Sequence, residues 1–387
     1  MTVSSRPQPG KRPPNRRALI LEAATELFAD RGFENVAMSD IADAVAVGPS
    51  ALYRHFASKT ELLVAAIAEV TGDVARLDES VDSVDAALRR LATYAVDHRL
   101  SGALWQRESR QLPPERRTPL RADLRRLRDR IADLVIRERP GLALDQARVL
   151  SVAAIAAVFS PAFHHTSIDR PGFETLLVQI AGRVIDVDVP MATAAVPQVS
   201  GVVPASRREA VLAAAMRLFA ERTYATVGVE DIASAAGMAG SSVYLQFAGK
   251  TEILLAALQR GTGYLQLTLN ETLASARSED DALRQLVDIY ARFAMRHPEL
   301  VDALITEVRS LPREQAGELA ADQRAYVGEW VQLYRRLRPE DDLSTATVVV
   351  QAALTVINDL ARAPTFRTRG DAIEVAAKLA RSALQLT

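Results

Sequence analysis

The chain contains 387 residues, of which 49% are hydrophobic and 25% are charged, and this balance is typical of a globular protein rather than a disordered one. It has no cysteine, which excludes disulfides, cysteine nucleophiles and cysteine-based zinc sites. The formal net charge is −1, so overall electrostatics give no reason to expect a nucleic-acid partner, and only a local basic patch could support one.

Neither a membrane segment nor an enzyme motif is evident. No apolar run approaches the roughly 20 residues of a membrane span, and the start MTVSSRPQPGKRPPNRR has no apolar segment of the signal-peptide kind. We therefore expect a cytoplasmic protein without a membrane partner. The chain has no Gly-rich phosphate loop, nucleophile elbow or metal-ligand spacing, so we expect no enzyme, no cofactor and no metal.

Residues 1–14 form the first predicted segment, a basic disordered arm. Arg6, Lys11 and Arg12 lie in it, Arg16 and Arg17 follow, and no Asp or Glu stands among them. The intervening prolines keep such a segment extended. It could lie along a nucleic-acid backbone, or it could be a solvated tail that only keeps the protein soluble.

Residues 15–66 form the first predicted domain. Leu21, Ala24, Leu27 and Phe28 make one apolar stripe of a first helix. Gly32 then suits the left-handed conformation that ends a helix. A second helix is predicted over residues 39–45.

A third helix, PSALYRHF, begins at Pro49, because proline is favoured at a first helical position. Leu52 and Phe56 share the face that packs on the core. The other face presents small, aromatic and basic side chains, namely Ser50, Ala51, Tyr53, Arg54 and His55. Two short helices joined by a tight turn predict a helix-turn-helix domain whose second helix enters the major groove of DNA; a generic helical hairpin is the alternative.

Helical patterns continue through residues 67–187, the first predicted ligand-binding and interface domain. Trp105 and Phe159 are candidates for a pocket wall or for the core. Arg110 belongs to an arginine-rich run that could hold a phosphate or carboxylate ligand such as an acyl-CoA, or could be a solvated helix face. His164 and His165 point about 100° apart on a helix, so they are poorly placed as a metal-chelating pair.

A stretch rich in Pro, Ala and Val at residues 188–204 predicts a linker, after which the chain repeats itself. Residues 17–66 align without a gap with residues 208–257. The identical pairs include Leu27/Leu218, Phe28/Phe219, Asp40/Asp231, Ile41/Ile232, Ala42/Ala233, Tyr53/Tyr244, Phe56/Phe247, Lys59/Lys250, Thr60/Thr251, Glu61/Glu252 and Leu63/Leu254. ESRQLPPE at 108–115 returns as EVRSLPRE at 307–314.

The repeat predicts a second helix-turn-helix domain over residues 205–257 and a second helical ligand-binding and interface domain over residues 258–387. Alanine-rich runs such as VLSVAAIAAVF and TATVVVQAALTVI allow helices to pack closely, as a bundle between the two units would require. The predicted fold class is all-α, with two fused units of the same type.

RALILEAATELFADRGF, DIADAV and ALYRHFASKTELL, in this order and at this spacing, resemble the DNA-binding domain of TetR-family transcriptional regulators. The resemblance implies a regulator that binds a double-stranded DNA operator, with a small effector, lipid-like or an acyl-CoA, bound in the helical domains. The whole chain is similar to a subgroup of actinobacterial regulators with two fused TetR units, some of which repress genes of lipid or sterol import and catabolism.

Site residues follow from the same resemblance. Pro49, Ser50, Ala51 and Tyr53 would face the groove, Tyr53, His55 and Lys59 would hold phosphates, Arg54 would share their surface, and Arg17 would lie along the DNA backbone. The corresponding residues of the second copy are Arg208, Gly240, Ser241, Ser242, Tyr244, Gln246 and Lys250. Trp105, Arg110 and Phe159 are the candidate effector contacts.

The two copies differ at positions that matter for this function. Thr223 replaces Gly32, Gly240 replaces Pro49, and Leu245 and Gln246 replace Arg54 and His55. Thr223 should cost about 1 kcal/mol or change the helix end. Neither copy has the threonines that usually cap the second helix in the family, because Val36 and Ala37 stand there in the first copy and Val227 and Gly228 in the second.

Because the two recognition surfaces are unlike, we predict a ligand-responsive repressor in which one chain acts as a pseudo-dimer on an asymmetric operator. Further homodimerisation stays open. One alternative is that only the first copy binds DNA and the chain homodimerises on a palindrome. The other is a ligand or interaction module that does not touch DNA, which burial of Tyr53 and His55 would favour.

Overall fold

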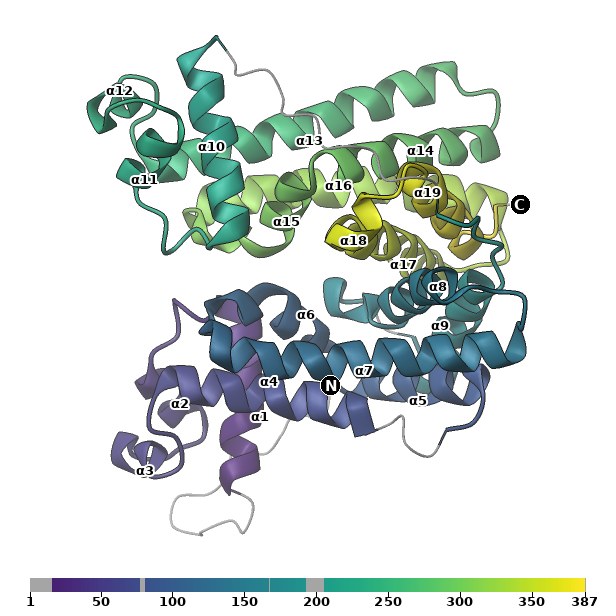
Figure 1. Cartoon of the computed structure of the whole chain (residues 1–387), viewed down its shortest axis with the longest axis horizontal. Coiled ribbons are helices and arrows are strands. Elements are labelled where there is room, and N and C mark those ends of the chain that lie inside the picture. The colour runs from purple at the N-terminus through teal and green to yellow at the C-terminus, as the bar shows by residue number, and fades with distance from the viewer. Residues whose placement is uncertain (1–15, 77–80, 167, 193–204, 387) are drawn as a thin grey trace. The chain divides into compact units, whose positions relative to one another are not determined.

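The computed structural model describes residues 16–76, 81–166, 168–192 and 205–386, and within these ranges its regular elements are all helices (Figure 1). The predicted all-α fold class is confirmed. The basic arm, residues 1–14, lies outside the described residues.

The two halves of the chain repeat one order of helices. The first half contains α1 (Arg16–Arg31), α2 (Met38–Ala44), α3 (Pro49–Tyr53), α4 (Lys59–Arg76), α5 (Val84–Asp97), α6 (Arg99–Glu108), η1 (Ser109–Gln111), α7 (Pro114–Glu138), α8 (Leu144–Val158), η2 (Ser160–Phe163) and α9 (Arg170–Ile185). The second half contains α10 (Arg207–Glu221), α11 (Val229–Ala235), α12 (Gly240–Tyr244), α13 (Lys250–Ser275), α14 (Glu279–Arg296), α15 (Pro298–Thr306), η3 (Val308–Ser310), α16 (Arg313–Leu337), α17 (Leu343–Ala361), α18 (Pro364–Arg367) and α19 (Ala372–Ala383). The short helices η1 and η3 fall in the two LP motifs that the sequence repeats.

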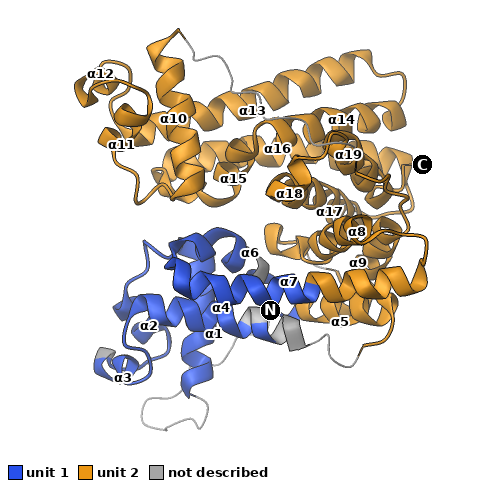
Figure 2. Ribbon diagram, viewed as in Figure 1, with its two compact units in different colours: residues 1–80, 97–127 blue, residues 81–96, 128–387 orange. Residues whose placement is uncertain are grey.

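The chain divides into two compact units (Figure 2). Unit 1 comprises the described residues within 1–80 and 97–127, and unit 2 those within 81–96 and 128–387. Unit 1 therefore holds the first helix-turn-helix domain. Unit 2 holds the second one together with most of both helical domains.

Unit 1 is built around the apolar stripe of α1. Phe28 and Ala24 are fully buried and Leu21 nearly so, against Ile41 of α2 and Leu52 of α3. Residues of α4 and α6 complete this core. The predicted inward face of the third helix is thus confirmed, since Leu52 is 0% exposed and Phe56, just after the helix, is 3% exposed.

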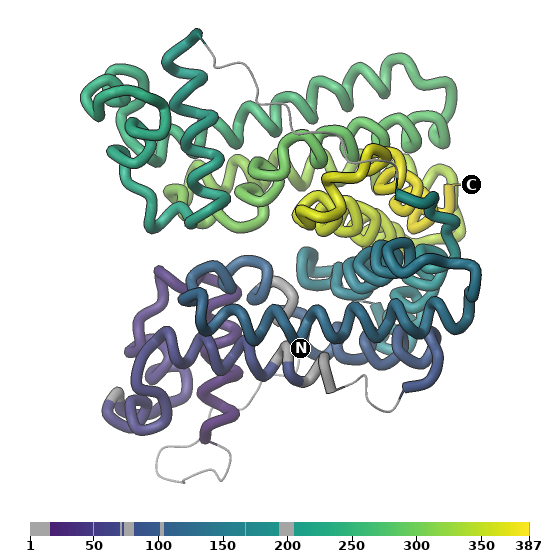
Figure 3. Tube along the Cα trace, in the orientation of Figure 1, coloured from purple at the N-terminus to yellow at the C-terminus, as the bar shows by residue number. Residues whose placement is uncertain are grey.

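The second helix-turn-helix domain has an equivalent core within unit 2. Val211, Phe219, Ile232 and Val243 from α10, α11 and α12 pack together with α13. Ala303 of α15 belongs to the same core. α15 thus links the second helix-turn-helix domain to the helical domain behind it, where α14 and α16 accompany the long helix α13 (Figure 3).

Four helices of unit 2 form a bundle that joins the two halves of the chain. α8 and α9 come from the first half, α17 and α19 from the second, and α17 packs on α8 while α19 packs on α9 (Figure 1). Alanines such as Ala153 and Ala154 of α8 and Ala352 and Ala353 of α17 are fully buried, so the helices can approach closely.

α17 has the length and apolar composition of a membrane-crossing helix. Its most apolar 18-residue stretch has a mean hydropathy of 1.4, and 61% of that stretch is buried inside the protein. The sequence reading that no apolar run approaches such a length missed it. Its packing against α8, α16 and α19 is that of a core helix.

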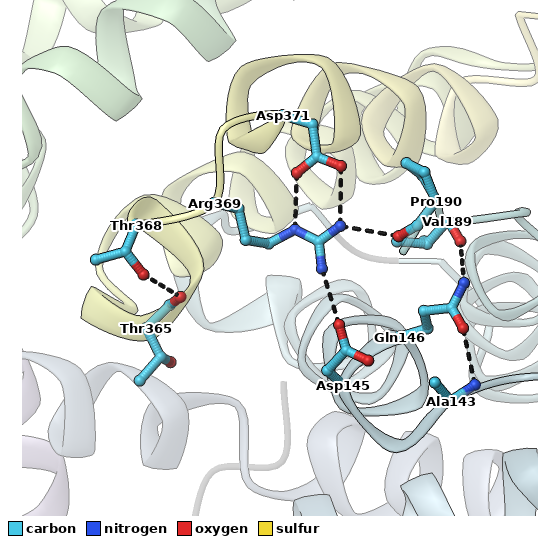
Figure 4. Close-up of polar contacts among 9 residues, drawn as sticks. All are labelled: Ala143, Asp145, Gln146, Val189, Pro190, Thr365, Thr368, Arg369 and Asp371. Atoms are coloured by element: carbon cyan, nitrogen blue, oxygen red, sulfur yellow. Dashed lines mark hydrogen bonds and ion pairs between the residues drawn. The ribbon is translucent and has the colours of Figure 1, made fainter. Parts of the chain in front are cut away.

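The residues that follow α9, up to Pro190, pack against the bundle. Val187 and Val189 are buried, and the carbonyl of Asp188 accepts a hydrogen bond from Lys378 Nζ at 2.7 Å. Arg369, 8% exposed, pairs with Asp371 and Asp145 and donates to the carbonyl of Pro190 at 2.9 Å (Figure 4). The first residues of the predicted linker are thus held against both halves of the bundle; residues 193–204 lie outside the described residues.

Candidate nucleic-acid interface

The first recognition helix, α3, exposes the side chains that the sequence assigns to DNA. Gly48 precedes it in an extended conformation, and Pro49 opens it. Tyr53 is 53% exposed, and Ser50, Arg54 and His55 are exposed as well, while Ala51 is half-buried. The exposed Tyr53 hydroxyl and ring are therefore accessible to DNA.

An aspartate caps the helix before each recognition helix. Asp40 Oδ2 accepts a hydrogen bond from the N–H of Ala37 at 2.8 Å, and Asp231 Oδ2 accepts from the N–H of Gly228 at 2.8 Å. The missing threonine caps are thus offset by half of a capping box, in which the third helical residue reaches back to the N-cap. Sequence reasoning noted the repeated Asp-Ile-Ala but missed this role of its aspartate.

The segment after each recognition helix is fixed in the same way. Ser58 Oγ accepts from the N–H of Glu61 at 3.1 Å, and Glu61 Oε2 accepts from the N–H of Ala57 at 2.7 Å. In the second copy Glu252 Oε2 accepts from the N–H of Ala248 at 2.5 Å. The repeated Lys-Thr-Glu motif therefore includes the carboxylate that fixes the turn into α4 and α13.

Lys59 and Lys250 make contacts that the sequence did not predict. Lys59 Nζ donates to the carbonyl of Phe33 at 2.7 Å and lies 4.3 Å from the centre of that ring. Lys250 Nζ donates to the carbonyl of Tyr224 at 2.7 Å and lies 4.2 Å from the centre of that ring. Burial lowers the pKa of the Lys250 amine. Each lysine thus ties the start of a long helix to the turn after the first helix. Their predicted phosphate contacts remain predictions.

Arg17 and Arg208 lie beside the ends of the recognition helices. The guanidinium of Arg17 is 5.2 Å from the ring centre of Phe56, and that of Arg208 is 4.1 Å from Phe247. Arg208 Nη1 also donates to the carbonyl of Gln246 at 2.7 Å. These contacts place a positive charge where each recognition helix ends, as a contact to the DNA backbone would need.

The second recognition helix, α12, presents a different surface. Tyr244 is 57% exposed, matching Tyr53, and Ser241 is exposed, while Ser242 and Gln246 are half-buried. Leu245 is 79% exposed where the first copy has an arginine.

Gly240, the first residue of α12, is buried because the carboxylate of Glu230 lies against it. A Cβ on Gly240 would come within 2.1 Å of Glu230 Oε1. The sequence predicts a flexible start of α12 where glycine replaces Pro49, but it does not predict the contact with Glu230.

The three predicted effector contacts do not share one compact unit. Trp105 and Arg110 belong to unit 1 and Phe159 to unit 2. Trp105 is half-buried against the core of the first helix-turn-helix domain, and the ring of Phe159 lies 6.4 Å from that of Tyr94. Both aromatic side chains are half-buried, and their predicted effector contacts remain predictions. Arg117, near Arg110 in unit 1, has its pKa lowered by burial and then by Arg121 and Arg110.

A buried aromatic cluster in the second helical domain was not predicted. The ring centre of Tyr290, on α14, lies 6.3 Å from that of Tyr326 and 6.1 Å from that of Trp330, both on α16. Burial raises the pKa of Tyr290 to about 12, and its hydroxyl donates to Asn358 Oδ1 at 2.8 Å. Tyr326 Oη and Trp330 Nε1 are shielded from solvent and lie close enough to interact with each other, but neither makes a hydrogen bond of good geometry to any described residue.

The sequence did carry a signal for this cluster. When the two LP motifs are aligned, Tyr326 and Trp330 of α16 fall on Leu127 and Ile131 of α7. One copy thus has an aliphatic face where the other has polar aromatic side chains. Buried polar groups without a well-formed hydrogen bond are uncommon in folded proteins, and a bound ligand or water is one way to satisfy them.

Comparison with known proteins points to one family. Residues 20–66 and 211–257 match the model described as bacterial regulatory proteins, tetR family, and residues 276–386 match a tetracyclin repressor-like C-terminal domain. The HTH-type transcriptional activator FasR of Mycolicibacterium smegmatis (strain ATCC 700084 / mc(2)155) is 30% identical over 170 residues, which are 40% of this chain and 74% of FasR. The HTH-type transcriptional repressor KstR2 of the same strain is 30% identical over 118 residues, 27% of this chain and 56% of KstR2.

Among solved structures, a TetR-family transcriptional regulator from Bordetella parapertussis 12822 aligns with a TM-score of 0.44 at 19% identity. The alignment covers 46% of this chain and 94% of that one.

Proposed function

This chain belongs to the tetR family of bacterial regulatory proteins, which are DNA-binding transcriptional regulators, and from this premise we propose that one chain acts as a pseudo-dimer. Its two helix-turn-helix domains read the two half-sites of one operator. Because the two recognition surfaces differ, the half-sites are unlike and the operator is asymmetric.

The intrachain bundle carries this proposal. A two-fold homodimer pairs the same surface of two subunits. In this chain α8 and α9 of one half pack against α17 and α19 of the other, so two corresponding surfaces already pair inside one polypeptide. A second chain is then not needed to supply a second helix-turn-helix domain.

DNA contacts are assigned to exposed side chains of both copies. Tyr53 and Tyr244 are the largest of them, and each stands at the end of a short recognition helix. Serines near the start of each helix let the backbone approach base edges, while Arg17 and Arg208 lie where phosphates pass. The exposure of Tyr53 and His55 counts against a module that never touches DNA.

One observation favours a different arrangement. Leu245 and Glu230 give the second surface an exposed apolar side chain and a carboxylate where the first has Arg54 and Ser39. If these changes abolish DNA binding, only the first domain reads DNA and two chains meet on a palindrome.

The test is fluorescence anisotropy at fixed salt on DNA from upstream of the chain's own gene, with the mass of the complex measured. Tyr53→Ala and Tyr244→Ala should each weaken specific binding by about tenfold or more, with one chain per site. Tyr264→Ala, which removes a 45% exposed tyrosine from α13, is the matched control and should bind as the wild type does.

Loss of binding in Tyr53→Ala alone, with two chains per site, would instead establish the palindrome arrangement. Unchanged binding in both variants would contradict the assignment of these tyrosines to DNA.

We also propose that an effector binds in the second helical domain and lowers operator affinity, so that the protein represses in its absence. The buried Tyr326 Oη and Trp330 Nε1 support this position, because neither makes a hydrogen bond of good geometry to a described residue. A ligand with hydrogen-bonding oxygens would give this pair a partner among aromatic rings. Such a ligand shifts the equilibrium only if it binds the DNA-incompetent state more tightly.

Fatty acids, acyl-CoAs and sterols are the classes to screen, by thermal shift and by DNA release. In a Trp105→Phe variant Trp330 is the sole tryptophan, so an effector at this place should change its fluorescence. Tyr326→Phe should weaken effector binding without altering DNA affinity. A ligand that releases DNA yet leaves the fluorescence of Trp330 unchanged would refute this location, and a screen that yields no such ligand would count against the switch.

A further inference from the structure

We propose that Glu230 is a base-reading residue of the second helix-turn-helix domain and that it selects cytosine in the second half-site. This inference rests on the proposed function, namely that the second domain binds DNA. It adds to that function a specificity-determining residue that lies outside the recognition helix itself.

The geometry of the second domain brings this carboxylate to the recognition helix. Glu230 is the second residue of α11, yet its carboxylate reaches the first residue of α12, where it covers Gly240. The placement depends on glycine, because a Cβ at residue 240 would stand 2.1–2.5 Å from the carboxylate atoms.

The first copy has Ser39 and Pro49 at the two corresponding positions. The first copy therefore has neither the carboxylate nor the glycine of the second copy. The two substitutions in the second copy therefore form one structural change, which sets a negative charge at the start of its recognition helix.

Glu230 is not occupied in holding the fold. It is exposed, and no hydrogen bond or ion pair joins it to another described residue. Its neighbour Asp231, by contrast, caps α11 and pairs with Arg222 at 3.2 Å. A carboxylate without a structural partner at this place is available to a group on the DNA.

The chemistry of the major groove restricts what that group can be. An ionised carboxylate only accepts hydrogen bonds, and it is repelled by phosphates and by the acceptor atoms of guanine and thymine. Cytosine offers its N4 amino group with no acceptor beside it on its own edge, whereas adenine pairs its N6 donor with the N7 acceptor. Cytosine is therefore the base that a carboxylate at this position favours.

The experiment measures the affinity of the full chain for operators in which each base pair of the second half-site is replaced in turn. The wild type should prefer cytosine at one position by about tenfold, and Glu230→Ser, which introduces the first copy's residue, should lose that preference. Glu230→Gln should move the preference toward adenine, whose N6 and N7 suit an amide.

Glu221→Ser is the matched control. Glu221 is an exposed glutamate of the same domain, at the end of α10, where it pairs with Arg217 at 3.6 Å. This variant should keep the preference for cytosine.

Two results would overturn the inference, and they are distinguishable. If Glu230→Ser binds every second half-site more tightly by the same factor, the carboxylate only repels DNA and reads no base, although the second domain does bind. If neither base replacement in the second half-site nor Tyr244→Ala changes the affinity, the second domain does not bind and the proposed function itself fails.

Discussion

Gly32 and Thr223 stand at the same place after the first helix of each helix-turn-helix domain, and both have a positive φ, 82° and 133°. L-residues rarely adopt such a conformation, so the second copy holds a strained backbone at Thr223. The positive φ is thus kept when threonine replaces glycine, and α10 also ends one position earlier than α1, so the expected cost stays a prediction while the helix end does change. Thr223 is 2% exposed, so its packing offsets part of the cost.

Gly32→Ala should therefore lower the free energy of unfolding of unit 1 by ~1 kcal/mol, because alanine disfavours the positive φ at this position. The added Cβ would meet no atom closer than 3.8 Å, so a clash does not contribute. Gly182→Ala, the same change inside α9 with nothing within 4 Å, should instead stabilise the protein slightly. Thermal unfolding followed by circular dichroism measures both variants, and a shift in the same direction for both would contradict the argument.

Asp231 gives a prediction for acid stability. The hydrogen bond from the N–H of Gly228, and then Arg222, lower the pKa of this carboxyl. The native state therefore binds a proton less readily than the unfolded chain. The resulting stabilisation is complete above the usual Asp pKa of about 3.9 and is lost as the pH falls through the lowered pKa.

Asp231→Asn keeps an acceptor for Gly228 but removes this titration, so the difference in melting temperature between pH 7 and pH 3 should shrink. Asp322→Asn, at an exposed aspartate of α16, changes the net charge equally and should leave that difference as it is. Equal behaviour of the two variants would contradict the role of Asp231.

At the scale of elements, α17 owes its composition to its neighbours. Val348, Val350, Ala353 and Ile357 are fully buried, so almost every side of this helix is covered by protein. A helix that is apolar all round is stable in water only when it is enclosed in this way. Its small residues set how closely α8 can approach.

Ala353→Leu should lower the stability of the bundle by about 1–3 kcal/mol, because its enlarged side chain has no space to enter. Ala321→Leu, on an exposed position of α16, should change stability by less than about 0.5 kcal/mol. Melting temperatures of the two variants provide the comparison. If Ala353→Leu has the same melting temperature as the wild type, α17 is not closely packed at this residue.

At the scale of the whole molecule, helices from the two halves of the chain are already paired in one bundle within unit 2. The bundle is reinforced by Arg369, which joins Asp145 of the first half to Asp371 of the second and also holds Pro190 (Figure 4). The side chains of Arg369 and Asp371 are 6% and 8% exposed, so removing the guanidinium would leave a buried carboxylate without its partner.

Cleavage of the chain between residues 193 and 204, at an inserted protease site, should leave one particle of unchanged mass, because the bundle holds the two fragments together. Adding Arg369→Ala should make the cleaved protein dissociate more readily, whereas Arg170→Ala, which removes a more exposed ion pair with Glu174, should not. Analytical ultracentrifugation distinguishes the two states. Separation of the wild-type fragments would show that the covalent linker alone joins the halves.

Local features of this protein could be predicted from sequence because they depend on spacing along the chain. The period of Ala24 and Phe28, the proline at residue 49 and the inward pair Leu52 and Phe56 define a helix-turn-helix domain without any distant contact. The repeat then gave the second domain and the all-α class. A helix and its apolar face follow from residues three and four apart, so one sequence suffices to find them.

Only the tertiary structure decided which distant groups meet. It pairs Lys59 with the carbonyl of Phe33, joins α8 to α17, and lays the carboxylate of Glu230 over Gly240. It also assigns the predicted pocket residues Trp105 and Phe159 to different compact units, and it buries the Tyr326 hydroxyl and the Trp330 N–H without a well-formed hydrogen bond to any described residue. Such contacts depend on how helices pack in three dimensions, and no pattern within a single helix specifies its partner.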